Sequence, residues 1–306
     1  MRARTGAASA SRPRHAYPAQ RIAAGIGLTI LAIGLFTVMD TIGKGLSARY
    51  PVPQVVWARY VFQLGWMLLL IPRIGAIGLV RTTRLGMNLV RGLLLAVATL
   101  FMFTAISFVP LADAYTVTFT APLLITVFSI PLLGERVGWR RWSAVVAGFV
   151  GVLIVIRPGV GMPHWALALP LVTALGFALY QILTRKVAGT PGETSVAMLF
   201  YVASVGAVVT SALVPFFWRT VAPLDWVPMA AMGLLGGIGH LILIRALTIA
   251  PASLLAPFVY TQIVWALVLG YLVFGDLPSV WMLLGGAVIV ASGLYVFYRE
   301  AVLGKS

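Results

Sequence analysis

About ten stretches of this sequence are apolar for close to the length that crosses a lipid bilayer, and this feature constrains the fold most. A spanning α-helix needs roughly 20 predominantly apolar residues, because the hydrocarbon core is about 30 Å thick. The sequence predicts such helices over 22–46, 54–72, 86–109, 112–133, 142–157, 164–187, 194–217, 226–249, 252–274 and 279–298. The stretches are continuous rather than alternating, which argues against a transmembrane β-barrel.

The composition predicts the same class of protein. Hydrophobic residues make up 61% of the 306 residues and charged residues 9%, whereas a soluble domain is roughly half apolar and a quarter charged. So few polar side chains cannot cover a globular surface, and we predict an all-α integral membrane protein. The sequence contains no cysteine, which excludes disulfides and thiolate chemistry.

The formal charge of +15 is unevenly placed along the predicted helices. Most Lys and Arg residues fall in the segments 1–21 and 299–306 and in the connections after the second, fourth and sixth helices. The positive-inside rule then predicts ten helices with both termini cytoplasmic, and an uncleaved first helix. Charge clustered at headgroup level favours contact with membrane lipids and argues against nucleic acid as a partner.

The two halves of the chain repeat one another. The positions that match at a constant offset of 141 residues are Ala105 and Ala246, Pro110 and Pro251, Thr120 and Thr261, Gly134 and Gly275, and Glu135 and Asp276. We predict two five-helix repeats, over 22–157 and 158–298. An odd number of helices makes the second repeat enter from the opposite side. Inverted repeats place a substrate path at their interface, and rocking about it gives alternating access.

The same stretches carry a resemblance to a known family. The sequence PLADA…GERVGWRRWSAVVAGFVGVLIV and its repeat PASLLAPFVYTQIVWALVLGYLVFGDLPS resemble the EamA-type ten-helix members of the drug/metabolite transporter superfamily, over about residues 22–298. The resemblance implies a central cavity lined by helices 1, 3, 4, 6, 8 and 9. It also implies export of amino acids or other small metabolites across a bacterial inner membrane, with the aromatic-amino-acid exporters as the nearest functional comparison.

One departure from exact repetition concerns proline. Pro122 in the fourth helix matches Ile263, and the ninth helix carries Pro257 instead. The bends are therefore not required to fall at equivalent depths in the two halves.

The first helix carries a polar stripe of Thr37, Asp40, Thr41 and Lys44. Their spacing places them on one helix face, and such a face should meet protein or water rather than lipid. Two hypotheses remain open for Asp40. It forms a structural ion pair with Lys44, four residues later, or with Arg59 on the second helix, or it is a gate or ion-coupling group.

Two further charged or titratable candidates lie on the eighth helix. His240 either bonds a neighbouring helix or titrates near neutral pH and couples transport to protons. Arg245 either extends toward the headgroups or faces the cavity, where its planar guanidinium would bind a carboxylate.

A larger set of aromatic, hydroxyl and amide residues lies on the predicted cavity helices. With Thr37 and His240, the cavity candidates are Tyr115, Thr116, Phe119, Thr120, Tyr180, Gln181, Tyr260, Thr261, Gln262 and Trp265. Each could simply join helices, but as a set they suit an apolar site with scattered polar groups, fit for a zwitterion with an apolar side chain. Gly148, Gly151, Gly285 and Gly286 indicate close packing of the fifth and tenth helices.

These features favour a secondary transporter over other classes of membrane protein. A lipid or lipid-linked-sugar flippase shares the architecture and remains an alternative. A membrane-embedded enzyme on lipid substrates is less favoured, because the seven acidic residues and three histidines are dispersed and form no metal or acid–base motif. We predict no enzymatic activity, no metal and no cofactor. No phosphate-binding loop is present, so either an ion gradient or downhill flow would drive transport.

Overall fold

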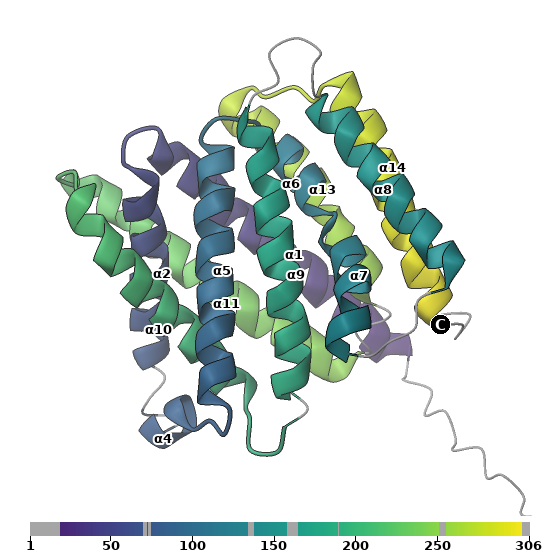
Figure 1. Ribbon diagram of the computed structural model, residues 1–306. Helices are drawn as coiled ribbons and strands as arrows, with labels where there is room; N and C mark the ends of the chain where they lie inside the picture. Colours follow the sequence, from purple (N-terminus) through teal and green to yellow (C-terminus); the bar gives the residue numbers. More distant parts are fainter. Residues whose placement is uncertain are drawn as a thin grey trace, which may run out of the picture.

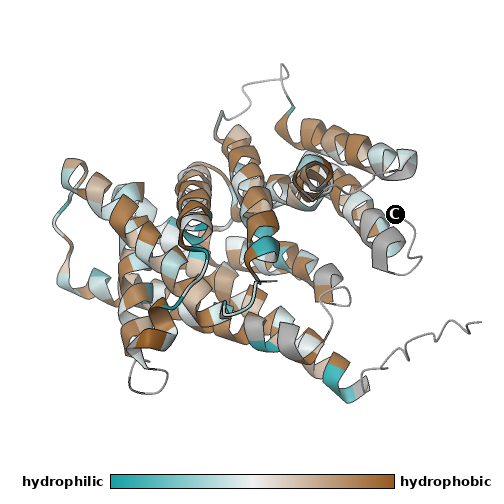
Figure 2. Cartoon of the chain, turned by 60° about the horizontal axis from the view of Figure 1, so that its bottom comes forward, coloured by the Kyte–Doolittle hydropathy of each residue, from teal (hydrophilic) through white to brown (hydrophobic). Residues whose placement is uncertain are grey.

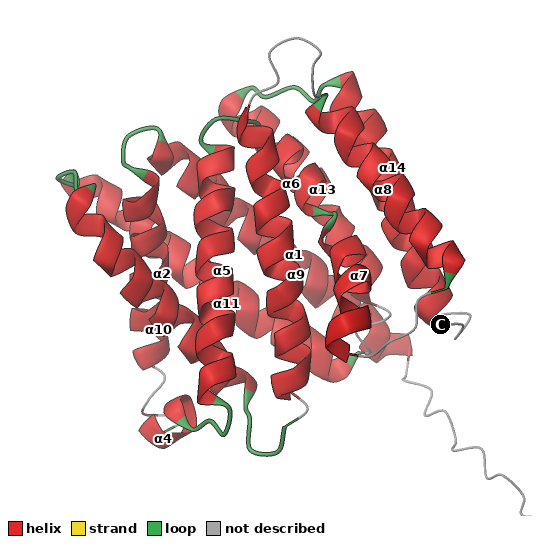
Figure 3. Cartoon of the chain, viewed as in Figure 1, coloured by secondary structure: helices red, strands yellow, loops and turns green. Residues whose placement is uncertain are grey.

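The computed structural model describes residues 19–69, 72, 75–133, 138–157, 165–188, 190–250 and 255–301. Regular secondary structure within these ranges is helical and includes no strand (Figure 3), so the predicted all-α class is confirmed for the described residues. The basic segment ahead of Ala19, the turn that holds Glu135 and the last residues, 302–306, lie outside them.

The helices of the first half begin and end close to the predicted positions. They are α1 (Ala19–Ser47), α2 (Val52–Leu68), α4 (Ala76–Val80), α5 (Leu85–Ile106), α6 (Leu111–Thr118), α7 (Ala121–Leu133) and α8 (Trp139–Ile156). The short helix α4 was not predicted. It lies in the connection between α2 and α5, at the lower end of the bundle in Figure 1.

The second half follows the same plan with more irregular helix ends. Its elements are η1 (Trp165–Ala168), α9 (Leu169–Ala188), α10 (Ser195–Leu213), η2 (Val214–Phe216), η3 (Pro223–Asp225), α11 (Trp226–Ile249), η4 (Ala256–Tyr260), α13 (Thr261–Leu269), η5 (Gly270–Phe274) and α14 (Val280–Ala301).

The fourth and ninth predicted helices are each interrupted. The predicted helix 112–133 breaks between α6 and α7, where Phe119 and Thr120 form a turn ahead of Pro122, whose ring nitrogen cannot donate a helix hydrogen bond. In the second half the 3₁₀ segment η4 contains Pro257 and gives way to α13 at Thr261. Thr120 and Thr261 match at the repeat offset, so the interruptions coincide although the prolines do not.

The halves pack on one another in a matched way (Figure 1). The first helix of each half packs on the third helix of the other, α1 on α11 and α9 on α5. The second helices do the same, α2 on α11 and α10 on α5, and the last helices α8 and α14 pack together. This reciprocal packing is what two repeats related by a pseudo-two-fold axis produce.

Glycine allows α8 and α14 to approach closely. A Cβ atom added to Gly151 would lie 2.9 Å from the carbonyl oxygen of Gly285, and one added to Gly285 would lie 2.6 Å from the carbonyl oxygen of Gly151. Side chains would hold the helices apart, so the predicted role of these glycines in helix packing agrees with the structure.

Hydrophobic residues predominate along the helices (Figure 2). Large apolar side chains such as Val146, Leu153 and Val208 are exposed, as expected for a surface that meets lipid. Six helices of the described residues are long and apolar enough to cross a membrane, and three shorter ones are apolar as well. Together these helices identify a multi-pass membrane protein.

The two ends of the bundle carry different connections. The end with α4 also holds the connection between α9 and α10 (Figure 1), and we call it the α4 end. The opposite end holds the turn between α1 and α2 and the turn between η5 and α14, and we call it the far end.

Candidate substrate site and gate

Asp40 lies inside the bundle, as the polar stripe of α1 predicts. Its side chain is only 8% exposed, and its carboxylate accepts a hydrogen bond from the hydroxyl of Tyr115 on α6. The side chain of Gln262 on α13 lies near the Tyr115 hydroxyl. These three polar side chains therefore lie together where α1 and α6 of the first half meet α13 of the second.

The predicted ion pairs of Asp40 are wrong in this conformation. Lys44 instead binds Asp276, with 2.7 Å between Nζ and Oδ2. Arg59, on α2, donates to the Thr99 hydroxyl at 3.1 Å and to the Met39 sulfur at 3.3 Å. Arg59 still interacts electrostatically with Asp40, although the described residues include no ion pair between them.

Arg59 is a buried cation with neutral partners. Its side chain is 6% exposed, and its guanidinium carbon lies 4.9 Å from the centre of the Tyr60 ring. The hydroxyls of Tyr60 and Thr99 are themselves hydrogen-bonded at 2.9 Å. A guanidinium held this way keeps the ability to bind a carboxylate brought by a ligand.

Lys44 joins the two halves at the far end. Besides the Asp276 carboxylate, its ammonium donates to the carbonyl oxygen of Val109 at 3.1 Å and lies 4.7 Å from the centre of the Phe274 ring. Lys44 and Val109 belong to the first half, whereas Phe274 and Asp276 belong to the second. We call these four residues the far-end gate, after the role that we propose for them.

The backbone at the end of η5 places Asp276 in the gate. Gly275 has a φ of +71°, a conformation that residues with a Cβ atom adopt at a cost. Its N–H donates to the Tyr271 carbonyl at 3.0 Å, and the Asp276 N–H donates to the Gly270 carbonyl at 3.1 Å. The Gly–acid turn noted in the sequence therefore ends the helix and turns Asp276 back toward α1.

A second cluster at the far end also joins the halves. Arg49 forms an ion pair with Asp225 at 2.8 Å, and the Tyr50 hydroxyl donates to the same carboxylate at 2.6 Å. The Tyr50 hydroxyl accepts in turn from the Ala222 N–H at 3.1 Å. The turn after α1 is thereby fixed to the start of α11.

The α4 end has its own contact between the halves, made by Glu193. The carboxylate accepts from the hydroxyls of Thr82 and Thr83 at 2.7 and 3.0 Å, and from the N–H groups of Thr83 and Arg84 at 2.7 and 3.1 Å. These groups precede α5, whose first residues have no side-chain cap of their own. A carboxylate from the second half therefore caps a helix of the first.

The pKa of Glu193 follows from this environment. Burial opposes ionisation, but hydrogen bonds from Thr82, Thr83 and Asn88 outweigh it and lower the pKa from its ordinary value. A depressed pKa stabilises the fold above the unfolded-state pKa, and this contribution is lost as pH falls through the folded-state pKa.

We therefore expect Glu193→Gln to lower the apparent unfolding temperature at neutral pH. The loss should be small, about 1 kcal/mol, because water screens a contact this exposed. Thermal unfolding of parent and variant in the same detergent, measured from neutral to acidic pH, checks this. The two curves should converge at acidic pH, and a constant difference at every pH would contradict the assignment.

The hydroxyls of the predicted cavity set are largely satisfied within their own helices. Thr37, Thr116 and Thr120 have no exposed surface and donate to the carbonyls of Ile33, Ala112 and Val117 at 2.8–2.9 Å. Thr261 donates to the Phe258 carbonyl at 2.6 Å. In this conformation the hydroxyls of these residues are bonded within their own helices.

Two aromatic contacts lie near the repeat interface. Phe119 and Tyr260, from the matched interruptions, have ring centres 5.0 Å apart. His240 is half-buried on α11, and its ring lies 4.8 Å from that of Phe36. Its Nδ1 is hydrogen-bonded to the Gly236 carbonyl at 2.7 Å, a bond within its own helix.

The remaining predicted residues lie apart from Asp40. Tyr180 faces α5, where the guanidinium of the buried Arg91 lies 5.1 Å from its ring centre. Gln181 and Arg245 are exposed. Trp265 is 36% exposed and packs over Gly34 of α1.

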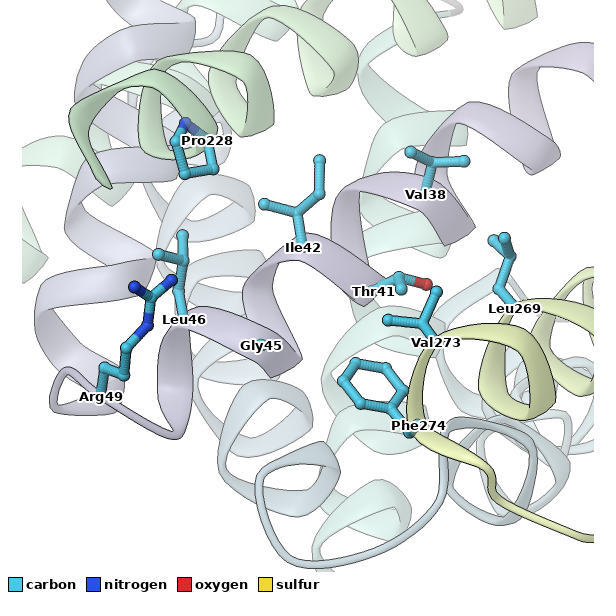
Figure 4. Close-up of a pocket in the computed structure, with 10 residues that line it drawn as sticks. All are labelled: Val38, Thr41, Ile42, Gly45, Leu46, Arg49, Pro228, Leu269, Val273 and Phe274. Atoms are coloured by element: carbon cyan, nitrogen blue, oxygen red, sulfur yellow. The ribbon is translucent and has the colours of Figure 1, made fainter. Parts of the chain in front are cut away.

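A cavity of about 350 Å³ opens at the far end between α1, α11 and the end of the ninth helix (Figure 4). Its lining is apolar apart from Thr41 and Arg49, with Ile42, Val273 and Phe274 on its walls. A second, small cavity of about 10 Å³ lies beside Asp113 and Asp276. The predicted cavity set lines neither of these two cavities.

Sequence reasoning missed most partners in these clusters. Asp276 was identified from the sequence only as a landmark of the repeat, and Asp225, Glu193 and Arg91 were not predicted as site residues. A signal was present for Asp276, because it occupies the Gly–acid turn that both halves share. Its contact with Lys44 spans 232 residues and depends on how the halves meet.

The fold and site define a class of protein. The apolar helices form two interlocked halves, which bury charged side chains at their interface and contact one another through polar groups at both ends. These are features of a membrane transporter. The sequence matches the EamA-like transporter family twice, over residues 23–157 and 164–298. The chain therefore belongs to the EamA-like transporter family.

Curated relatives cover nearly the whole chain. An S-adenosylmethionine uptake transporter of Rickettsia conorii is 26% identical over 90% of this chain and 93% of its own length. A riboflavin transporter of Vibrio cholerae is 24% identical over 89% and 93%. The pseudopaline exporter CntI of Pseudomonas aeruginosa is 27% identical over 88% and 94%.

A solved crystal structure shares the fold. It superposes with a TM-score of 0.62 at 20% identity, over 92% of this chain and 98% of that chain. The family match confirms the predicted resemblance. The family and the relatives together indicate a small-metabolite transporter rather than an enzyme, and a multi-pass protein of a bacterial membrane.

Proposed function

We propose that this protein is a secondary carrier for metabolites that contain an amino-acid group, and that it works by alternating access. The observation that carries the proposal is that Asp40 and Arg59 lie inside the bundle, near enough to interact but each bonded to other groups. Both are buried, they interact electrostatically, and no ion pair between them is present among the described residues. A carboxylate and a guanidinium in this relation complement the ammonium and carboxylate groups of a zwitterion.

The contacts between the halves support the alternating-access part. Tyr115, which donates to Asp40, lies beside Gln262 of the second half, so ligand binding at Asp40 would affect contacts of both halves. Lys44 and Asp276 close the far end in the described conformation. We propose that these contacts break and re-form as the halves rock about the site.

The named relatives suggest which substrate to test first. S-adenosylmethionine carries an α-amino-acid group, and a relative that spans 90% of this chain is named as its uptake transporter. Other relatives are named for riboflavin and for export of pseudopaline. Because these relatives include both uptake transporters and an exporter, the export that the sequence predicts is tested by measuring the direction of transport.

Transport by purified protein in proteoliposomes tests the proposal. Labelled amino acids, S-adenosylmethionine and riboflavin would be supplied with and without a pH gradient, and export would be assayed from loaded vesicles of known protein orientation. We expect saturable transport of an amino-acid-containing compound, and a dependence on the pH gradient if protons are coupled. Transport of riboflavin alone, or of none of these compounds by folded protein, would contradict the proposed substrate class.

We further propose ten spans with both termini cytoplasmic, which makes the far end periplasmic. Because the sequence lacks cysteine, single cysteines report topology cleanly. Cysteines at Ser11 and Gly189 should react with an impermeant thiol reagent only from the cytoplasm, and those at Ser47 and Pro223 only from the periplasm. Labelling of Ser11 and Ser306 variants from opposite sides would contradict the helix count.

A further inference from the structure

The ammonium of Lys44 occupies a site that resembles a binding site for a free cation. It contacts a carboxylate oxygen of Asp276 at 2.7 Å, a carbonyl oxygen of Val109 at 3.1 Å and the face of the Phe274 ring at 4.7 Å. A carboxylate, a carbonyl and an aromatic face are the groups that hold ammonium ligands in proteins. The lysine side chain is 14% exposed, so the cation is largely removed from water.

A second carboxylate makes this site more negative than one lysine can neutralise. Asp113, in the first turn of α6, interacts electrostatically with both Asp276 and Lys44. Its Oδ1 atom is buried and has no hydrogen-bond partner among the described residues. The small cavity of about 10 Å³ is lined by both carboxylate residues. One ammonium therefore lies near two acids but contacts only Asp276, and Asp113 keeps a buried oxygen with no hydrogen-bond partner among the described residues.

Lys44 must leave the site when α1 moves away from it. Lys44 reaches the site from α1, whereas Phe274 and Asp276 belong to the second half and Asp113 lies on α6, which packs on α13 of the second half. Movement of α1 away from α6 and from the end of η5 would withdraw the lysine from Asp276 and expose a negative site beside an aromatic ring. Unpaired carboxylates this close to an apolar environment are costly, so a replacement cation is favoured.

We propose that Asp113, Asp276 and Phe274 form a subsite for an organic cation, an alkylammonium or sulfonium group of the substrate, and that Lys44 is a built-in competitor that fills it when the far end is closed. The proposal rests on the proposed transport function for its substrate, but the cation site itself is testable without transport. The lysine would return as the cation leaves, so that binding and closure exclude one another.

Chemical replacement of the lysine tests the site directly. In purified Lys44→Ala, n-butylammonium should raise the apparent unfolding temperature, and n-butanol at the same concentration should not. Adding Asp113→Asn should raise the half-maximal n-butylammonium concentration at least tenfold. Equal effects of amine and alcohol, or no change with Asp113→Asn, would overturn the proposal. If Lys44→Ala does not fold, Lys44→Met with methylammonium replaces it, with methanol as the neutral control.

A second measurement connects the site to the substrate. S-adenosylmethionine and S-adenosylhomocysteine differ by a methyl group and the sulfonium charge, so their affinity ratio isolates recognition of the cation. In protein that retains Lys44, Asp113→Asn should reduce this ratio at least tenfold. Asp225→Asn, which removes a carboxylate from the same end but outside the site, should leave the ratio unchanged.

Failure of the proposed transport function and failure of the cation subsite give different results. If the parent binds neither compound, the proposed substrate class is contradicted, and the alkylammonium experiment still decides whether the cation site exists. If Asp113→Asn weakens both compounds equally, Asp113 has only a structural role and the subsite proposal is wrong.

Discussion

Replacing Asp40 with asparagine is expected to reduce transport about tenfold or more while leaving the protein folded. The substitution keeps the size of the side chain but removes the charge that would bind a substrate ammonium. A hydrogen bond to a charged group is worth about 1.5–3 kcal/mol, and 1.4 kcal/mol corresponds to a factor of ten. Initial transport rates per folded protein in proteoliposomes, measured across a range of pH, check this expectation.

Two further variants, one at the hydrogen-bond partner Tyr115 and one at the matched control Asp225, test the role of Asp40 more specifically. Tyr115→Phe removes the hydroxyl that donates to Asp40, and the double variant should lose less than the sum of the single losses, because residues in contact give non-additive effects. Asp225 is also a buried aspartate with a tyrosine donor, so Asp225→Asn should affect stability more than rate. Parent-like transport by Asp40→Asn at every pH would contradict a substrate-binding role.

Linking the far-end gate covalently is expected to abolish transport. In a Lys44→Cys/Asp276→Cys variant, a short bifunctional thiol reagent would join α1 to the turn before α14. The far end could then no longer open, and alternating access would stop. Because the sequence contains no other cysteine, loss of transport after treatment and recovery after reductive cleavage of the linker can be assigned to this pair.

The single-cysteine variants treated with the same reagent are the control for modification without linkage. They should transport at the rate of their untreated forms. Unchanged transport in the fully linked double variant would show that the far end does not open during the cycle, and would contradict the gate.

The helices and the inward position of Asp40 could be predicted because each depends on local sequence. Apolar stretches of spanning length predict helices wherever they pack, and the spacing of Thr37, Asp40, Thr41 and Lys44 fixes their shared face. The interlocked halves follow from a repeat with an odd number of helices. The interruptions after Thr120 and before Thr261 coincide at the repeat offset. The unmatched prolines alone did not predict whether the two helices would break at equivalent positions.

The partners of the buried charges could not be predicted, because they depend on contacts between halves. Spacing along α1 favoured an ion pair of Lys44 with Asp40, yet Asp276 competes successfully once the Gly275 turn directs it toward α1. The roles of the threonine hydroxyls could not be predicted for a different reason. A threonine that donates to the carbonyl four residues before it, as Thr37 and Thr116 do, looks the same in sequence as one that lines a site.

Counterflow of labelled S-adenosylmethionine in proteoliposomes tests the central claim most directly. Vesicles loaded with unlabelled compound are diluted into a trace of labelled compound, and a carrier that alternates between its two faces accumulates label transiently above equilibrium without any ion gradient. The account predicts this overshoot for the parent protein, a smaller overshoot for the unlinked Lys44→Cys/Asp276→Cys protein because it lacks the Asp276 carboxylate, and no overshoot when the far-end gate is linked. No overshoot from folded parent protein with this compound or any labelled amino acid, or an overshoot that survives linking, would contradict it.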